Sequence, residues 1–300
     1  MKEFLDESSC LRTRLILKLR FNSGPLRIGG GEREGPILQI LRVPVKGKLL
    51  PVIPESSWRG VLRRIGEWIS KASRFQSPME NELVAHHMER DVLDHLMSTD
   101  VLEKIKEEVR AVEDEVLERF LPRDLISRLR EEPEIINSRD LQSFLSVLCP
   151  ICRLFGGQGL KGKLTLEDTV LNQGFSQPRS HVAIGRIAGV REEEHLFRAE
   201  YFFPEEVVLE VIVDNITPKS SEALILSGVI DWILKLGLEI GGFKSRGSGY
   251  LELKGGKEHS YGIFLDFQAL EGRNLARAFT NPESIGRKMG LSELIAFLRG

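Results

Sequence analysis

The sequence predicts an α+β protein that follows a β-α-β-β-α-β order and carries a large helical insertion. Segments with apolar residues at every second position indicate strands, and two segments with apolar residues at helical spacing indicate helices. Residues 78–148 contain 18 acidic and 9 basic side chains, whereas the remaining residues contain 26 acidic and 33 basic ones. This asymmetry indicates an acidic insertion in a mildly basic body, which is permissive for nucleic acid.

The first predicted strand covers residues 11–21, where apolar residues alternate with a second, mainly cationic row. A period of two places the two rows on opposite faces of a half-buried strand. The outer row contains Arg12, Arg14, Ile16, Lys18 and Arg20. A basic sheet face would suit single-stranded RNA, and a solvated sheet face is the commoner alternative.

The first predicted helix starts at Ser56 or Ser57, either of which can cap it. Its apolar face begins at Trp58, and its other side carries three arginines near the helix start: Arg59, Arg63 and Arg64. Backbone amides at a helix start can bind phosphate, so this segment is a candidate phosphate contact. A solvated helix face is the competing interpretation.

The insertion, residues 78–148, has helical periodicity and no catalytic motif, and the pair Cys149 and Cys152 follows it. A zinc ion held by this C-x-x-C pair would need two further ligands. The insertion offers three histidines for that role: His86, His87 and His95. A pair of structural thiols is an equally good interpretation, so zinc is a candidate here and no cofactor is required.

The second half of the chain supplies the remaining predicted elements. They are a strand around residues 164–171, a long polar segment at 172–200, a strand at 207–213, a helix from Ser220 or Ser221 to Leu236, a strand at 250–253 and a small helix within 282–300. The long polar segment is a loop or an extended hairpin, and segments of this kind are usually functional.

This order of elements is the plan of a ferredoxin-like or RRM-like sheet. The strands lack an RNP1-type aromatic motif, which disfavours an ordinary RRM. We expect a discontinuous core at residues 1–77 and 149–270, the acidic insertion at 78–148, and a helical tail at 271–300.

Residues 241–250 form a glycine-rich loop between the second helix and the fourth strand. Gly242 and Gly247 have the spacing of a nucleotide-binding P-loop, but Ser248 and Gly249 stand where Lys and Ser or Thr are needed. The loop also follows a helix instead of opening one, which disfavours ATP. Its glycines and cations could hold a polyanion backbone, or they could form a solvated turn.

With these elements in place, the chain resembles the RAMP superfamily of CRISPR effector subunits. The likeness is greatest to the backbone, or RNA-filament, subunit of type III complexes of the Csm or Cmr type. Four segments carry the resemblance: residues 26–31 (LRIGGG), 53–63 (IPESSWRGVLR), 149–156 (CPICRLFG) and 241–250 (GGFKSRGSGY). Residues 181–186 and 196–200 add weaker support.

The resemblance implies a ferredoxin-like core that polymerises along a CRISPR RNA and acts in antiviral defence beside other effector subunits. Residues 182–198 would be a thumb that enters between the guide and the target RNA. The implied RNA contacts are Arg27, Ser56, Ser57, Arg59, Arg63, His181, Arg186, Gly242, Lys244, Ser245, Arg246 and Gly247. Contacts of this kind address phosphate and shape, so no base specificity is expected.

One departure from the family pattern concerns cleavage. Backbone subunits that cut target RNA use an aspartate in the loop before the Ile-Pro-x-Ser-Ser segment, and Arg42 stands at the aligned position. An arginine can neither bind a metal ion nor accept a proton, which favours a subunit without a catalytic residue. Glu32 and Glu34 could substitute if the loop is shifted in register.

Two other functions remain open. One is a metal-dependent RAMP endoribonuclease that cleaves target RNA, or a precursor-processing relative in which His181 would be the acid–base candidate. The other is a zinc-stabilised protein-interaction module. The three cysteines are too few for a disulfide framework, and neither a membrane-length apolar run nor a signal peptide is evident, so we expect a cytoplasmic protein.

Overall fold

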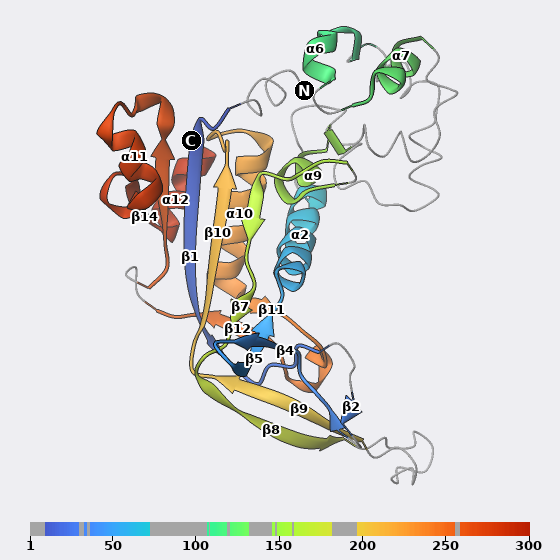
Figure 1. Cartoon of the computed structure of the whole chain (residues 1–300), viewed down its shortest axis with the longest axis vertical. Helices are drawn as coiled ribbons and strands as arrows, with labels where there is room; N and C mark the ends of the chain where they lie inside the picture. Colours follow the sequence, from blue (N-terminus) through green and yellow to red (C-terminus); the bar gives the residue numbers. More distant parts are fainter. Residues whose placement is uncertain are drawn as a thin grey trace.

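The computed structural model describes residues 10–29, 33–34, 37–72, 107, 109–118, 121–131, 146–147, 149–157, 159–181, 197–255 and 259–300. It has a mixed α+β fold with mainly antiparallel sheets, which confirms the predicted class. A long sheet with helices against one face fills one half of the molecule, and a hairpin with short strands fills the other (Figure 1). No helix in the described part of the chain is long and apolar enough to cross a membrane.

The main sheet is built around β1 (Thr13–Ser23), which pairs with β10 (Val207–Asp214) along one edge. On the other edge, the end of β1 pairs with β12 (Tyr250–Leu253), and its beginning pairs with β13 (Tyr261–Asp266). The predicted strand at 250–253 is therefore an inner strand, which lies between β1 and β11. The sheet also contains β6 (Leu164–Leu166), β11 (Leu238–Glu239) and β14 (Arg287–Gly290).

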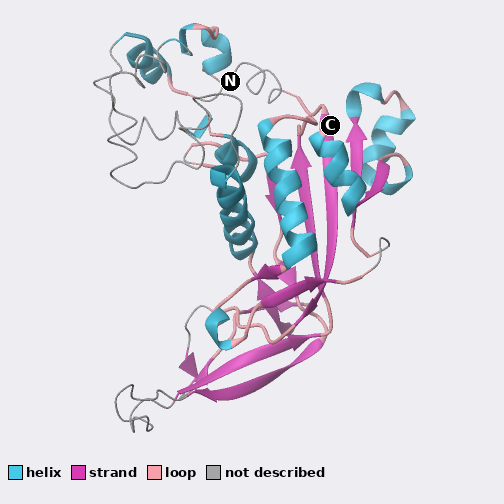
Figure 2. Cartoon of the chain, turned by 180° about the vertical axis from the view of Figure 1, so that it is seen from behind, coloured by secondary structure: helices cyan, strands magenta, loops and turns pink. Residues whose placement is uncertain are grey.

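Helices α2 (Glu55–Ala72) and α10 (Ser221–Leu236) lie side by side on one face of this sheet (Figure 2). The hydroxyl of Ser220 caps α10 by accepting a hydrogen bond from the Ala223 amide at 3.2 Å. Alternate residues of β1 and the Trp58 ring are buried in the single large core between the helices and the sheet. The helix α12 (Leu291–Arg299) packs against α10 on the side away from α2.

The other half of the molecule contains two smaller sheets. In one, β8 (Gly174–His181) and β9 (Phe197–Pro204) form an antiparallel hairpin, joined by β3 (Ile37–Leu38) and β2 (Arg33–Glu34). In the other, β5 (Lys48–Ile53) pairs with β4 (Arg42–Val45) and β7 (Thr169–Val170). Of the two alternatives for the polar segment at 172–200, its described parts form the hairpin.

The described parts of the insertion are helical, with α6 (Asp114–Leu117) and α7 (Arg123–Glu131), and α9 (Pro150–Phe155) follows. Val109, Val112 and Leu117, three of its periodic apolar residues, are buried. The tail holds more than the expected small helix. It contains α11 (Arg273–Thr280) and α12, and between them β14 adds a strand to the main sheet through β13.

Candidate nucleic-acid interface

The glycine-rich loop packs its backbone tightly against the segment that follows β1. Gly241 has a φ of 85°, and a Cβ there would collide with the carbonyl oxygen of Arg27. Gly249 has a φ of 90°, and a Cβ there would collide with the carbonyl oxygen of Ile240. The Gly242 amide donates to the Arg27 carbonyl at 2.8 Å. Glycine is therefore required at 241 and 249 by close backbone approach.

The tip of the loop is a 3-10 turn at Lys244–Arg246, and its side chains face solvent. Lys244, Ser245 and Arg246 are exposed, as is Gly247. Ser248 is buried instead, and its hydroxyl donates to the Gly242 carbonyl at 2.6 Å, which holds the two ends of the tip together. The loop thus presents two cations on a backbone that is fixed from beneath.

A cavity of about 460 Å³ lies between this loop and the first turns of α2. Among the predicted RNA contacts it brings together Ser56, Ser57, Gly242 and Lys244, although they come from segments far apart in the sequence. Arg64 also lines it. The site therefore combines two hydroxyls, two cations and glycine backbone, which is a suitable set for phosphate oxygens.

The amides at the start of α2 contribute less than the sequence suggested. The Glu55 amide donates to a carboxylate oxygen of Asp168 at 2.7 Å, and the Ser57 and Trp58 amides donate to the Pro54 carbonyl. These bonds occupy donors that would otherwise be offered to an anion. The cationic side chains are therefore the main source of attraction for phosphate in the cavity.

Arg59 and Arg63, both predicted RNA contacts, are directed away from the cavity. Arg59 pairs with Glu55 and donates to the Phe155 carbonyl at 2.6 Å. Arg63 pairs with Glu67 at 2.9 Å. It also donates to the Gly156 carbonyl at 2.6 Å and to the sulfur of Cys152 at 3.4 Å. Both guanidinium groups thus fasten α2 to α9 and to the residues after it.

An aromatic contact that the sequence interpretation missed joins the loop to the hairpin. Phe243, in the left-handed region with a φ of 58°, lies with its ring centroid 5.5 Å from His181, 5.9 Å from Phe197 and 6.4 Å from Tyr201. The Arg246 guanidinium lies 4.8 Å from the centroid of the Phe243 ring. An aromatic residue directly after two glycines at the start of the loop was the available signal for this anchor.

His181, a predicted RNA contact, is part of that cluster. Its Nε2 lies 2.8 Å from the Tyr201 hydroxyl. Burial lowers the pKa of His181, and the nearby cations Arg246, Arg179 and Arg27 lower it further. These surroundings therefore favour the neutral imidazole.

Arg27, also a predicted contact, supports the loop from below. It is buried, its guanidinium lies 5.1 Å from the Phe243 ring centroid, and it donates to the Gln39 carbonyl at 3.2 Å. Burial lowers the pKa of Arg27, with the Tyr201 and Glu200 side chains opposing that effect. The last predicted contact of this group, Arg186, lies outside the described residues.

Arg42 joins β4 to the hairpin. It forms an ion pair with Glu200 on β9 and donates to the Ser176 hydroxyl on β8 at 3.1 Å. Glu200 also accepts a hydrogen bond from the Ile40 amide at 3.2 Å. Burial alone would raise the pKa of Glu200, but the hydrogen bonds from Arg42, Ile40 and Ser176 outweigh it and hold the pKa below its usual value. The alternative acids Glu32 and Glu34 have side chains outside the described residues.

Cys149 and Cys152 are buried free thiols, Cys149 directly before α9 and Cys152 within it. A hydrogen bond with Cys149, together with burial, raises the pKa of Cys152, and Arg63 opposes this only in part. His86, His87 and His95 lie outside the described residues. Within the part of the chain that the structure describes, no group of three or more suitable side chains could hold a metal ion. A structural zinc ion therefore stays a prediction.

The outer row of β1 is cationic, but acids on a neighbouring strand and the turn before it compensate its charge. Arg14 pairs with Asp214 at 2.6 Å. Lys18 lies 3.6 Å from Glu210, and Arg20 pairs with Glu206 at 2.8 Å. A basic platform for RNA on this face is therefore not what the structure presents.

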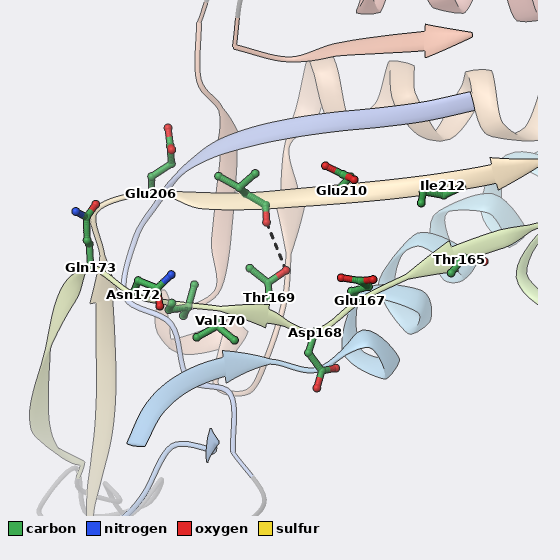
Figure 3. A pocket seen from close by; sticks show the side chains of 12 residues that line it. Thr165, Glu167, Asp168, Thr169, Val170, Asn172, Gln173, Glu206, Glu210 and Ile212 are labelled. Carbon is green, nitrogen blue, oxygen red and sulfur yellow. Dashed lines mark hydrogen bonds between the residues drawn. The ribbon is translucent and has the colours of Figure 1, made fainter. Parts of the chain in front are cut away.

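The same edge of the fold carries an acidic groove of about 530 Å³ between β6, β7 and β10 (Figure 3). Its carboxylates are Glu167, Asp168, Glu206 and Glu210. Two of them, Glu206 and Glu210, are the partners of Arg20 and Lys18, and the lining residues of the groove include no cation that would attract an RNA backbone. The cavity beside the glycine-rich loop is thus the better candidate for a polyanion.

Comparison with known proteins adds one match. A family model described as "RAMPs: RAMP superfamily" matches residues 23–252, about three quarters of the chain. The matched range contains α2, the hairpin and the whole glycine-rich loop. A search of curated proteins finds no match.

Proposed function

The chain belongs to the RAMP superfamily of CRISPR-associated proteins, and from this we propose that it is the backbone subunit of a type III interference complex. Family membership supports a CRISPR-associated, RNA-binding role. In the proposal, copies of the chain assemble along the CRISPR RNA beside other effector subunits, and target RNA pairs with the guide that they hold.

The cavity beside the glycine-rich loop is the observation that carries this proposal. It is lined by Lys244 from the loop and by Ser56, Ser57 and Arg64 from α2. Cations and hydroxyls around a glycine backbone can follow a sugar-phosphate chain without reading its bases. The guide backbone would run through this cavity, with Arg246 and the loop tip at its border.

The proposed core consists of the elements that follow the ferredoxin-like order. The strands β12, β1, β10 and β6 lie in this order in the main sheet, and α2 and α10 cover one face. The insertion at 78–148 would then be an addition to this core, joined to it through α9. The predicted thumb, residues 182–198, lies outside the described residues except for its end in β9. It would extend from the hairpin of β8 and β9, which contacts Phe243 and carries the Arg42–Glu200 pair.

We propose further that this subunit does not cut RNA. Arg42 stands where the resemblance places the cleaving aspartate, and its permanently charged guanidinium is already paired with Glu200. Incubation of the assembled complex with guide RNA, labelled target RNA and Mg²⁺ should give no cuts at the positions that this subunit occupies. Cuts that disappear in Glu32→Ala would instead assign an endoribonuclease activity to the chain.

The RNA-binding role is tested by a charge-matched pair of double variants. Arg64→Gln/Lys244→Gln removes the two cations of the cavity. Lys219→Gln/Arg273→Gln removes two exposed cations at the start of α10 and of α11, with the same loss of charge. Affinity for single-stranded RNA is measured at several salt concentrations. Loss of two phosphate contacts should reduce the slope of log K against log salt by about 1.4 for a single strand.

Only the cavity variant should show this reduction. An equal reduction in both variants would mean that net charge alone attracts the RNA. An unchanged slope in the cavity variant would place the phosphate contacts elsewhere and contradict the proposal.

A further inference from the structure

A second, more apolar pocket of about 230 Å³ opens directly beside the candidate phosphate cavity. It lies between α2, α10 and the start of β12, and we call it the tryptophan pocket. Its lining includes Trp68, Trp232, Leu236, Tyr250, Arg64 and Lys244. The last two residues line both the tryptophan pocket and the candidate phosphate cavity, so the two hollows are adjacent.

Large apolar side chains are unusually exposed in this pocket. Trp68 is 48% exposed, Tyr250 is 46% exposed and Leu236 is 57% exposed. The rings of Trp68 and Trp232 have centroids 5.6 Å apart and are tilted by 43°, and the Arg64 guanidinium lies 5.4 Å from the Trp68 ring centroid. A cluster of exposed aromatic rings generally marks a surface that binds a partner.

We propose that the tryptophan pocket takes an unpaired base of the RNA whose phosphates lie in the neighbouring cavity. This rests on the proposed RNA-binding function and extends it from the backbone to the base. Aromatic rings beside cations are the usual arrangement for single-stranded nucleic acid, because bases stack on the rings while the cations hold the phosphates.

The charges around the pocket set the orientation of the nucleotide. Arg64 and Lys244 lie on the side shared with the phosphate cavity, whereas Glu239 is the acidic residue of the lining. A phosphate would be attracted to the cations and repelled by the carboxylate. The uncharged base is the part of a nucleotide that fits beyond them, against Trp68 and Tyr250.

Stacking of this kind is tolerant of sequence, because every base has a π face. The pocket would therefore hold one base of the strand without selecting its identity. It would fix the register of the RNA relative to the chain, since a base held here places the next phosphates beside Lys244.

The test compares two RNA-like probes of equal length and charge, a short oligouridylate and the same ribose-phosphate chain without bases. Trp68→Leu keeps apolar volume at the half-exposed position and removes the aromatic face, and Trp68→Phe keeps an aromatic face. Wild type and Trp68→Phe should bind the oligouridylate with an affinity at least about fivefold higher than that of Trp68→Leu. The base-free chain should bind all three proteins equally.

The thermal midpoint of each variant shows whether it is folded. If Trp68→Leu weakens both probes equally, or neither, the pocket holds no base and the inference is overturned. The phosphate role is judged separately, by the binding of the base-free chain to Arg64→Gln/Lys244→Gln. A loss there, combined with no effect of Trp68→Leu on either probe, would reject the base pocket and leave the proposed function intact.

Discussion

Arg59 and Arg63 on α2 and Lys244 and Arg246 in the glycine-rich loop share one predicted role, contact with RNA phosphates, but lie in opposite surroundings. The two helix arginines donate to the carbonyls of Phe155 and Gly156 and hold α9 in place. The two loop cations are exposed at a tip whose backbone is fixed from below. The same charge therefore stabilises the fold in one region and is exposed to solvent in the other.

Helical geometry explains why the arginines of α2 divide in this way. Arg59 and Arg63 are four residues apart and share one stripe of the helix, which faces α9. Arg64 is rotated about 100° from Arg63, onto the stripe of Ser57 and Gly60, and that stripe lines the cavity. A row of cations near a helix start thus contains two surfaces, and only one of them is available to phosphate.

The largest expected effect is on stability, and it tests whether Arg59 and Arg63 hold the fold together. Arg59→Ala/Arg63→Ala removes donors from two carbonyls and removes the arginine partners of Glu55 and Glu67. We expect the free energy of unfolding to fall by about 2 kcal/mol or more, because hydrogen bonds from charged groups contribute about 1.5–3 kcal/mol each. Urea denaturation followed by circular dichroism measures this change.

Arg64→Ala is the matched control, since it lies one residue away on the exposed stripe. It should change the free energy of unfolding by less than about 0.5 kcal/mol. The salt dependence of RNA binding should single out Arg64 instead. Its slope should be smaller for Arg64→Ala and unchanged for Arg59→Ala/Arg63→Ala, measured at a temperature where that variant is folded. A smaller slope for Arg59→Ala/Arg63→Ala alone would show that Arg59 and Arg63 are the RNA contacts.

The sequence predicted the local elements of the fold better than their pairing. The strand at 11–21 and the helix that ends at Leu236 follow from periodicity within single segments, and both occur with ends shifted by two residues at most. Which strands flank β1 depends on contacts between residues about 200 to 250 positions apart, and β13 was missed for that reason. Local pattern does not specify such long-range pairing.

For the candidate site too, the sequence predicted the segments but not the contacts between them. Its segments could be found because glycine, serine and cations are grouped in them, and the cavity unites four of the predicted residues. The partner of Arg42, which is Glu200, and the partner rings of Phe243 could not be found, because each depends on how the hairpin folds back onto distant segments.

For the Arg42–Glu200 pair, which joins β4 to the hairpin, we expect an effect of intermediate size on the free energy of unfolding. Glu200 has a pKa below its ordinary value of 4.5 in the folded chain, chiefly because the hydrogen bonds from Arg42, Ile40 and Ser176 outweigh burial. A carboxyl group with a lowered folded pKa contributes stability that is fully present above its unfolded pKa. That stability is lost as the pH falls through the folded pKa.

The free energy of unfolding should therefore decrease on acidification below about pH 4.5, and Glu200→Gln should make this decrease shallower. At neutral pH, Glu200→Gln should cost about 1 kcal/mol, because the amide keeps one acceptor but loses the charge. Urea denaturation of both proteins between pH 3 and pH 7 measures the difference. Parallel pH profiles would mean that the pair does not hold the hairpin in solution.

The smallest expected effect concerns the outer row of β1, where the cations already face acids. Lys18→Gln/Arg20→Gln removes the same charge as Arg64→Gln/Lys244→Gln, but from pairs with Glu210 and Glu206. Exposed pairs of this kind contribute about 0–1 kcal/mol, so the change in stability should be small. The slope of RNA affinity against salt should be unchanged. A cation that is paired with a carboxylate neutralises no phosphate, so it releases no counterion when the RNA binds. A reduced slope would mean that RNA displaces these carboxylates, and the sheet face would then join the loop as a binding surface.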